Sequence, residues 1–148
     1  MSSTHLSLYY HIIFSTKMRR ACIRDSWEER LHHYLGGILR GLNGISKQIG
    51  GTADHVHILA SLGAIHRLAD VVRELKSESS KWVHEVVGVR LFGWQDGYGA
   101  FTVGKSQIDE VKQYIQGQKE HHRGKTFQEE YLELLRESGV DFDERFLW

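Results

Sequence analysis

The chain has 148 residues, of which 41% are hydrophobic and 26% charged; this is typical of one folded domain and too short for separate binding and catalytic domains. Lys plus Arg number 19, as do Asp plus Glu, which excludes the uniformly basic surface of a duplex-coating protein. No apolar run reaches the roughly 18 residues of a membrane helix, and the single Cys22 excludes an internal disulfide. We expect one soluble domain over residues 1–148, with no membrane contact, in a reducing cytoplasm.

The amino-terminal part of the chain predicts a strand followed by a helix. Residues 8–16 alternate side chains between two faces, which is typical of a strand that is buried on at least one side. Ser26 and Glu29 have the spacing of a capping box, which predicts that a helix begins there. Apolar residues then follow at helical spacing, namely Trp27, Leu31, Tyr34, Ile38 and Leu42.

Two further strands and a long helix are predicted in the middle of the chain. We expect strands at residues 45–49 and 55–61, joined by a turn at Gly50 and Gly51. An amphipathic helix is expected from about residue 66 to residue 87, because its apolar positions recur at helical spacing.

The last part of the chain predicts one more strand and two helices. Residues 98–103 suit a fourth strand, and Ser106 with Asp109 forms a second capping box that opens a helix containing Tyr114. Residues 128–137 predict a terminal helix.

This order of elements predicts an α+β fold of the ferredoxin-like, split β-α-β type. Such a domain has an antiparallel four-stranded sheet with helices on one face, here followed by a C-terminal helix that bears the tyrosine. The first and third strands are central neighbours in this topology. We therefore expect His11 to lie near the strand that carries His55 and His57.

A candidate metal site is the run His55-Val56-His57 on the third strand. Because successive side chains of a strand point to opposite faces, both imidazoles share one face while Val56 enters the core. A divalent metal takes more ligands than two, so others must come from another element, water or substrate. Two surface histidines are the alternative interpretation of this pattern.

A candidate nucleophile lies on the helix near the end of the chain. Tyr114, Gln118 and His121 have the spacing of residues on one helical face. A tyrosine with its ordinary pKa of about 10 attacks a phosphodiester poorly, unless a metal ion withdraws charge from the phosphate oxygens. The histidines would supply that metal; a half-buried tyrosine and an exposed amide are the alternative.

Two groups of cations are candidates for contacts with nucleic-acid backbone, although a solvated face explains each equally well. One group follows the first strand and the other lies on the polar face of the middle helix. The two groups are Lys17, Arg19, Arg20 and Arg24, and Arg73, Lys76 and Lys81.

Several fragments in a fixed order resemble one protein family over essentially the whole chain. The family is that of the HUH-type single-tyrosine transposases of the smallest bacterial insertion sequences. The fragments are Tyr10 to Lys17, Asp54-His55-Val56-His57, the Y-x-x-x-Q spacing of Tyr114 and Gln118, Leu75-Lys76 with Ser79-Ser80, Trp94 to Gly99, and His121-His122.

The resemblance implies a set of site residues. His55 and His57 would bind Mg²⁺ or Mn²⁺ with Gln118 as the third protein ligand, and Tyr114 would be the nucleophile. His11, Asp54 and His121 would support them. Two positions depart from the family pattern: Ala53 and Ala21 stand where proline is usual, which bears on the rigidity of the loop that enters the metal-binding strand.

The resemblance also implies an activity and its partners. Attack by the tyrosine on single-stranded DNA with hairpin ends would leave a 5′-phosphotyrosine and a free 3′-OH, and reversal with another 3′-OH would join new strands in a bacterial cytoplasm. The enzyme would be a homodimer in which the tyrosine-bearing helix of one subunit can complete the site of the other.

Two alternatives remain open. A domesticated relative would cleave hairpin DNA at chromosomal repeats without moving an element. A non-catalytic ferredoxin-like nucleic-acid-binding module would instead carry aromatic residues on its two central strands, where this chain has His55 and His57.

Overall fold

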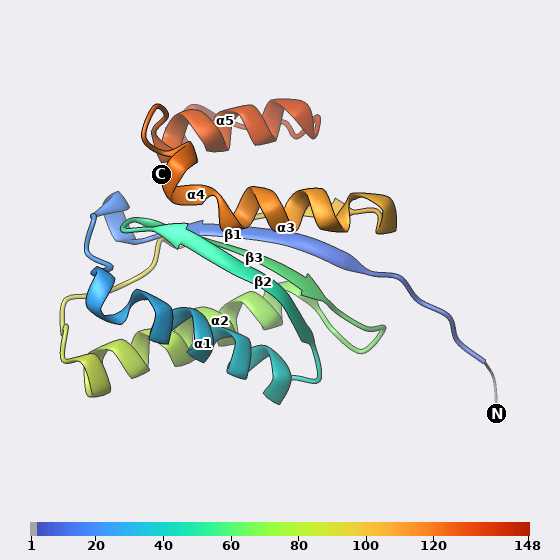
Figure 1. Ribbon diagram of the computed structural model, residues 1–148, viewed down its shortest axis with the longest axis horizontal. Coiled ribbons are helices and arrows are strands. Elements are labelled where there is room, and N and C mark those ends of the chain that lie inside the picture. Colours follow the sequence, from blue (N-terminus) through green and yellow to red (C-terminus); the bar gives the residue numbers. More distant parts are fainter. Residues whose placement is uncertain (1–2) are drawn as a thin grey trace.

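A four-stranded antiparallel sheet lies between two layers of helices in the computed structural model, which describes residues 3–148 (Figure 1). The strands follow the order β2-β3-β1-β4 across the sheet. This order confirms the predicted ferredoxin-like α+β topology. The strands are β1 (Tyr9–Ser15), β2 (Ile45–Thr52), β3 (His55–Ser61) and β4 (Gly99–Val103).

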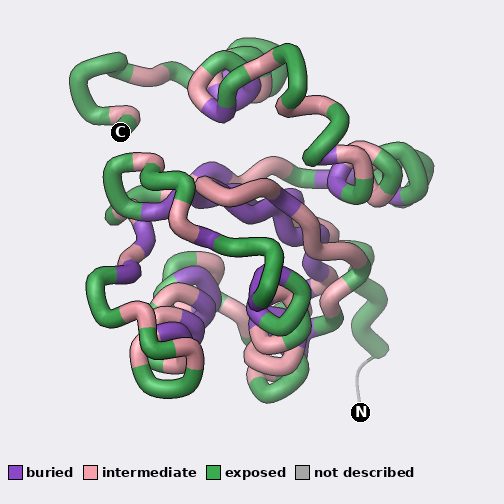
Figure 2. Tube along the Cα trace, turned by 60° about the vertical axis from the view of Figure 1, so that its left-hand side comes forward, coloured by how far each residue is buried: buried purple, intermediate pink, exposed green. Residues whose placement is uncertain are grey.

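The main apolar core lies between one face of the sheet and the two long helices, α1 (Asp25–Gly41) and α2 (Leu68–Trp82). Alternate residues of the two central strands point into it, and all are fully buried: Ile12, Phe14, Val56, Ile58 and Ala60. A turn of π-helix, Val83–Val87, continues α2. Figure 2 shows that buried residues are concentrated in the strands and on the sheet-facing sides of the helices.

The other face of the sheet is covered by α3 (Ile108–Gln116), α4 (Gln118–His121) and α5 (Phe127–Glu137). Helix α3 packs so closely on β2 that a Cβ atom at Gly50 would stand 2.3 Å from the Ile115 carbonyl oxygen. Helix α5 packs against β1 through Ile13. Short 3₁₀ turns cover Lys17–Arg19, Lys105–Gln107 and Glu144–Phe146. Within residues 3–148, no helix combines the length and apolar character needed to cross a bilayer.

The turn predicted at Gly50 and Gly51 is wrong, because both residues lie inside β2. The strands β2 and β3 instead turn at the two residues Ala53 and Asp54, with Thr52 opposite His55. Gly51 has φ +156 and a Cβ atom there would lie 2.2 Å from the His55 carbonyl oxygen. The glycines are therefore needed for close packing and not for reversal of the chain.

Both predicted capping boxes are also wrong. Helix α1 begins at Asp25, because Arg24 takes the extended conformation of a cap residue (φ −89, ψ 149), so that Ser26 lies within the first turn. A 3₁₀ turn at Lys105–Gln107 precedes α3, so Ser106 is not its cap residue. The single helix predicted through Tyr114 and His121 is divided at Gly117 into α3 and α4.

Candidate functional site

The side chains of His55 and His57 point from β3 toward the layer of α3, α4 and α5, and both are fully buried. Their common face follows from the strand period, as predicted. The antiparallel pairing of β1 with β3 brings His11 beside them, with His11 Nε2 2.7 Å from His57 Nδ1. The topology thus places three imidazoles on one face of the central strands.

Gln118 and Tyr114 approach these histidines from the helical layer. Gln118 is 1% exposed, and its Oε1 lies 2.8 Å from His55 Nε2. The Tyr114 ring lies 5.7 Å from the His57 ring. The break at Gly117 does not separate the two residues, because Gly117 N–H still bonds to the Gln113 carbonyl at 3.0 Å. One chain therefore brings together all four residues predicted for metal binding and attack.

Sequence reasoning missed Glu130, which lies at the centre of the cluster. This residue of α5 is 1% exposed, and its Oε1 lies 3.1 Å from His57 Nε2. Its Oε2 accepts hydrogen bonds from the Tyr114 hydroxyl and, at 2.9 Å, from Gln118 Nε2. A sequence signal existed, because Glu130 interrupts the apolar stripe of Phe127, Tyr131 and Leu134 on a predicted helix.

His122 was also missed as a site residue. Its Nε2 lies 3.0 Å from both Gln118 Oε1 and Glu130 Oε1. Ligand atoms of His55, His57, His122 and Glu130 all lie within 4.8 Å of one another. Imidazole nitrogens and a carboxylate oxygen at this spacing fit a divalent metal ion.

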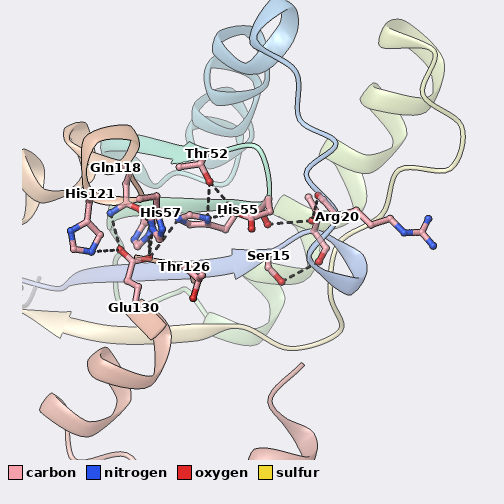
Figure 3. A network of polar contacts seen from close by, with 12 residues as sticks. Ser15, Arg20, Thr52, His55, His57, Gln118, His121, Thr126 and Glu130 are labelled. Atoms are coloured by element: carbon pink, nitrogen blue, oxygen red, sulfur yellow. Dashed lines mark hydrogen bonds and ion pairs between the residues drawn. The ribbon is translucent and has the colours of Figure 1, made fainter. Parts of the chain in front are cut away.

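Contacts outside the cluster orient its imidazoles, as Figure 3 shows for His55 and Thr52. His55 Nδ1 donates to Asp54 Oδ1 at 2.7 Å, and Thr52 Oγ1 donates to the same oxygen at 3.0 Å. His122 Nδ1 donates to the Lys125 carbonyl at 2.6 Å. Because these Nδ1 atoms hold protons, the Nε2 lone pairs of both rings face the centre, which is the tautomer that a metal ion requires.

Burial determines the protonation of the centre. It lowers the pKa of His57 to about 4 and, with help from His57, that of His11 to about 3. Burial alone would raise the pKa of Glu130, but the neighbouring His57 and the hydrogen bonds from Tyr114 and Gln118 outweigh it and leave this pKa far below its usual range. The Glu130 carboxylate therefore lies beside His57, which is neutral at pH 7, an arrangement that favours a bound cation.

Tyr114 is held as a neutral phenol. Burial and the hydrogen bond to the Glu130 carboxylate raise the pKa of its hydroxyl well above the ordinary value. His121, predicted on the same helical face, lies at the rim: its side chain is 30% exposed and its Nε2 is 3.4 Å from Glu130 Oε2. A cleft of about 510 Å³, lined by Asp54, His122 and Phe127 among others, opens beside the cluster.

The loop between β1 and α1 carries four of the predicted DNA contacts and adjoins the β2–β3 hairpin that carries His55 and His57. Thr16 N–H at the end of β1 donates to the Asp54 carbonyl at 2.8 Å. Met18 and Arg19 both take positive φ, 56 and 54, conformations that cost energy in residues other than glycine. The cations carried by this loop are Lys17, Arg19, Arg20 and Arg24.

The remaining predicted DNA contacts lie on α2, on the opposite side of the sheet. Lys76 donates three hydrogen bonds, to the carbonyls of Gln95 (2.7 Å), Asp96 (3.1 Å) and Gly97 (2.7 Å). Burial lowers its pKa to about 8. These bonds use every N–H donor of the ammonium group, so Lys76 holds this loop and is removed from the candidate phosphate contacts. Arg73, paired with Asp70 at 3.1 Å, and Lys81 lie on the same helix.

Hydrogen bonds restrain the turn between β2 and β3, where Ala53 stands in place of an expected proline. The Ala53 carbonyl accepts the Ile23 N–H at 2.9 Å, and Thr16 Oγ1 donates to the Asp54 carbonyl at 3.2 Å. The hairpin that enters β3 is therefore held by β1 and by the segment before α1.

The chain matches the model of the IS200-like transposase family over residues 4–118. It belongs to this family. It is similar to a crystal structure of a "putative transposase" from Deinococcus radiodurans R1, at 22% identity and a TM-score of 0.64, covering 80% of this chain and 96% of that one. It is also similar to a REP-associated tyrosine transposase solved with a REP hairpin, at 15% identity and a TM-score of 0.59. The match covers 84% of this chain and 75% of that one. No curated protein matches this transposase.

Proposed function

We propose that this IS200-like transposase cleaves and rejoins single-stranded DNA, with Tyr114 as the nucleophile and His55, His57 and Gln118 as ligands of Mg²⁺ or Mn²⁺. The observation that carries the proposal is the convergence of all four side chains in one buried cluster beside an open cleft. Family membership supports a DNA-cleaving activity.

The chemistry is a transesterification. Tyr114 Oη attacks phosphorus, the bond from phosphorus to the 3′-oxygen breaks, and a 5′-phosphotyrosine remains. The phenolic proton passes to Glu130 Oε2, with which it already shares a hydrogen bond. The leaving 3′-oxygen takes a proton from solvent and becomes a free 3′-OH. Attack by another 3′-OH on the phosphotyrosine reverses these steps and joins new strands.

The high pKa of Tyr114 beside Glu130 makes proton loss unfavourable in the metal-free site. A divalent cation bound to the histidines would offset the Glu130 charge and withdraw charge from the phosphate oxygens. Asp54 and His11 act as orienting groups, because they contact the Nδ1 atoms of His55 and His57 and so direct Nε2 to the centre.

DNA with hairpin ends is the proposed substrate. The similar tyrosine transposase bound to a REP hairpin supports this choice. The loop with Lys17, Arg19, Arg20 and Arg24 would contact backbone phosphates next to the site. A non-catalytic module that stacks bases on its central strands is disfavoured, because His11, His55 and His57 are buried beneath helices.

The decisive experiment looks for a covalent adduct. The protein is incubated with single-stranded DNA carrying an end hairpin and Mn²⁺, and the products are separated on a denaturing gel. We expect an adduct whose nucleotide-linked peptide contains Tyr114, and we expect Tyr114→Phe or EDTA to abolish it. Tyr34→Phe, on α1 across the sheet, is the matched control and should keep full activity.

An adduct that survives Tyr114→Phe would assign the nucleophile elsewhere, and no adduct on varied hairpins would favour a binding module. A dimer that shares sites between subunits is tested by mixing His57→Ala with Tyr114→Phe protein. Because one chain assembles the whole cluster, we expect the mixture to remain inactive. Recovered activity would show exchange of α3 between subunits.

A further inference from the structure

We propose that His122 and Glu130 bind the metal ion. They would join His55, His57 and Gln118 in one centre whose nitrogen-rich ligand set prefers a transition-metal ion, such as Mn²⁺ or Zn²⁺, to Mg²⁺. Both residues lie beyond residue 118, where the match to the family model ends. The inference rests on the proposed function, since it concerns the metal of the same site.

His122 and His55 each carry a proton on Nδ1. The Lys125 carbonyl can only accept a hydrogen bond, so His122 Nδ1, at 2.6 Å, must carry the proton. The same reasoning applies to His55 Nδ1 beside the Asp54 carboxylate at 2.7 Å. In the neutral rings both Nε2 atoms are consequently bare acceptors.

Those bare nitrogens face other acceptors. His55 Nε2 lies 2.8 Å and His122 Nε2 3.0 Å from the same oxygen, Gln118 Oε1. His122 Nε2 also lies 3.0 Å from Glu130 Oε1. Lone pairs from several groups thus converge on one buried point without enough protons to pair them. A cation at that point would satisfy all of them together.

The two oxygens of Glu130 have separate partners. Oε2 accepts from the Tyr114 hydroxyl and from Gln118 Nε2, which occupy it within the protein. Oε1 faces His57 Nε2 at 3.1 Å and His55 Nε2 at 3.6 Å. Oε1 is therefore the ligand atom, and Oε2 can still receive the proton of the nucleophile.

Helix α5 holds these groups over the histidines. The Phe127 ring stacks on the His55 ring at 4.5 Å, and Thr126 Oγ1 accepts the Glu129 N–H at 3.2 Å to cap the helix. Lys125 pairs with Glu133 on the same helix. The segment after residue 118 is thus fixed against the cluster by contacts that do not involve a metal ion.

Ligand chemistry gives the metal preference. Mg²⁺ binds mainly carboxylates, phosphates and water, whereas imidazole suits transition-metal ions. A site with three imidazoles, one carboxylate and one amide oxygen should favour Mn²⁺ and, more strongly, Zn²⁺ over Mg²⁺.

The experiment measures metal binding to the full chain without DNA. Metal-free protein is titrated with MnCl₂, ZnCl₂ and MgCl₂ in a calorimeter at pH 7.5. We expect Mn²⁺ to bind at least about tenfold more tightly than Mg²⁺. Glu130→Gln and His122→Asn should each weaken Mn²⁺ binding at least about tenfold. Pulsed electron paramagnetic resonance of bound Mn²⁺ should show one imidazole nitrogen fewer in His122→Asn.

Matched controls are Glu137→Gln, an exposed glutamate of α5, and His33→Asn, an exposed histidine of α1. Both should bind Mn²⁺ like the parent protein. Thermal unfolding with and without Mn²⁺ separates loss of binding from loss of folding: Glu130→Gln should still unfold cooperatively without metal, at a lower melting temperature, but should lose the rise caused by Mn²⁺. If Glu130→Gln or His122→Asn binds Mn²⁺ with unchanged or higher affinity, the proposal is overturned. Unchanged or tighter binding by Glu130→Gln would mean that the Glu130 side chain blocks the histidines from a metal ion.

This outcome is distinguishable from failure of the proposed function. If Glu130→Gln binds Mn²⁺ normally while the parent forms the Tyr114 adduct, the two additional ligands are wrong and the transferase stands. If both variants lose Mn²⁺ but no hairpin yields an adduct, the metal centre stands and the proposed reaction fails.

Discussion

The two faces of strand β3 are equally buried but chemically different. Toward α1 and α2 it presents Val56, Ile58 and Ala60, and toward the other helical layer it presents His55 and His57 ahead of Leu59, all with 0% exposure. Burial of the first set is favourable by itself, whereas buried polar groups need partners. The apolar face therefore explains why the sheet folds, and the polar face explains what the sheet positions.

The largest expected difference between the faces is in stability. Ile58→Ala should lower the free energy of unfolding by about 2 to 5 kcal/mol, because it leaves a cavity in the main core. His57→Gln should cost about 1 kcal/mol in EDTA, because a polar group remains beside Glu130. Urea unfolding with and without Mn²⁺ measures both: Ile58→Ala should keep the stabilisation by Mn²⁺ and His57→Gln should lose it. Equal losses in EDTA would contradict the comparison.

Acid should act on the histidines of the polar face, and also on His32 of α1, whose pKa burial lowers to about 4. Burial depresses the pKa values of His11 and His57 in the folded state, so the unfolded chain binds more protons as the pH falls through about 6.5. Stability in EDTA should therefore decrease from pH 7.5 to pH 5, by about 2 kcal/mol for each such histidine. Glu130 also contributes to the free energy of unfolding, because its pKa is lowered in the folded state. That contribution is lost only below its unfolded pKa of about 4.5, outside the range from pH 7.5 to pH 5.

A substitution on each face separates the histidines from other sources of this pH dependence. Urea unfolding of His11→Gln should give a shallower loss between pH 7.5 and pH 5, whereas Ile58→Ala should lower the whole profile and keep its slope. A His11→Gln profile as steep as that of the parent would show that the polar face is not the source.

The smallest expected difference is in binding to DNA. Arg20 lies in the loop next to the site, and Arg73 lies on α2 across the sheet, paired with Asp70. If DNA binds over the polar face, Arg20→Gln should reduce the slope of log affinity against log salt by about 0.7 for a single strand. Arg73→Gln should leave the slope unchanged. A reduced slope only in Arg73→Gln would place the DNA on the other side of the sheet.

Local patterns in the sequence predicted the strand and helix order well, and the limits of β3 were correct. They failed where a local motif competed with long-range packing. Gly50 and Gly51 are typical of a turn, but the close approach of α3 to β2 requires glycine there within a strand. Lys76 has the sequence context of a DNA contact, but folding places three carbonyls around its ammonium group.

By itself the sequence determined the common direction of His55 and His57 and the one-turn spacing of Tyr114 and Gln118, because both follow from the periods of regular structure. Only the tertiary structure decided that His122 and Glu130 belong with them. Glu130 is 73 positions from His57 in the chain, and their contact depends on α5 packing over β1 through Ile13. No local period encodes such a contact, because side-chain packing across distant elements creates it.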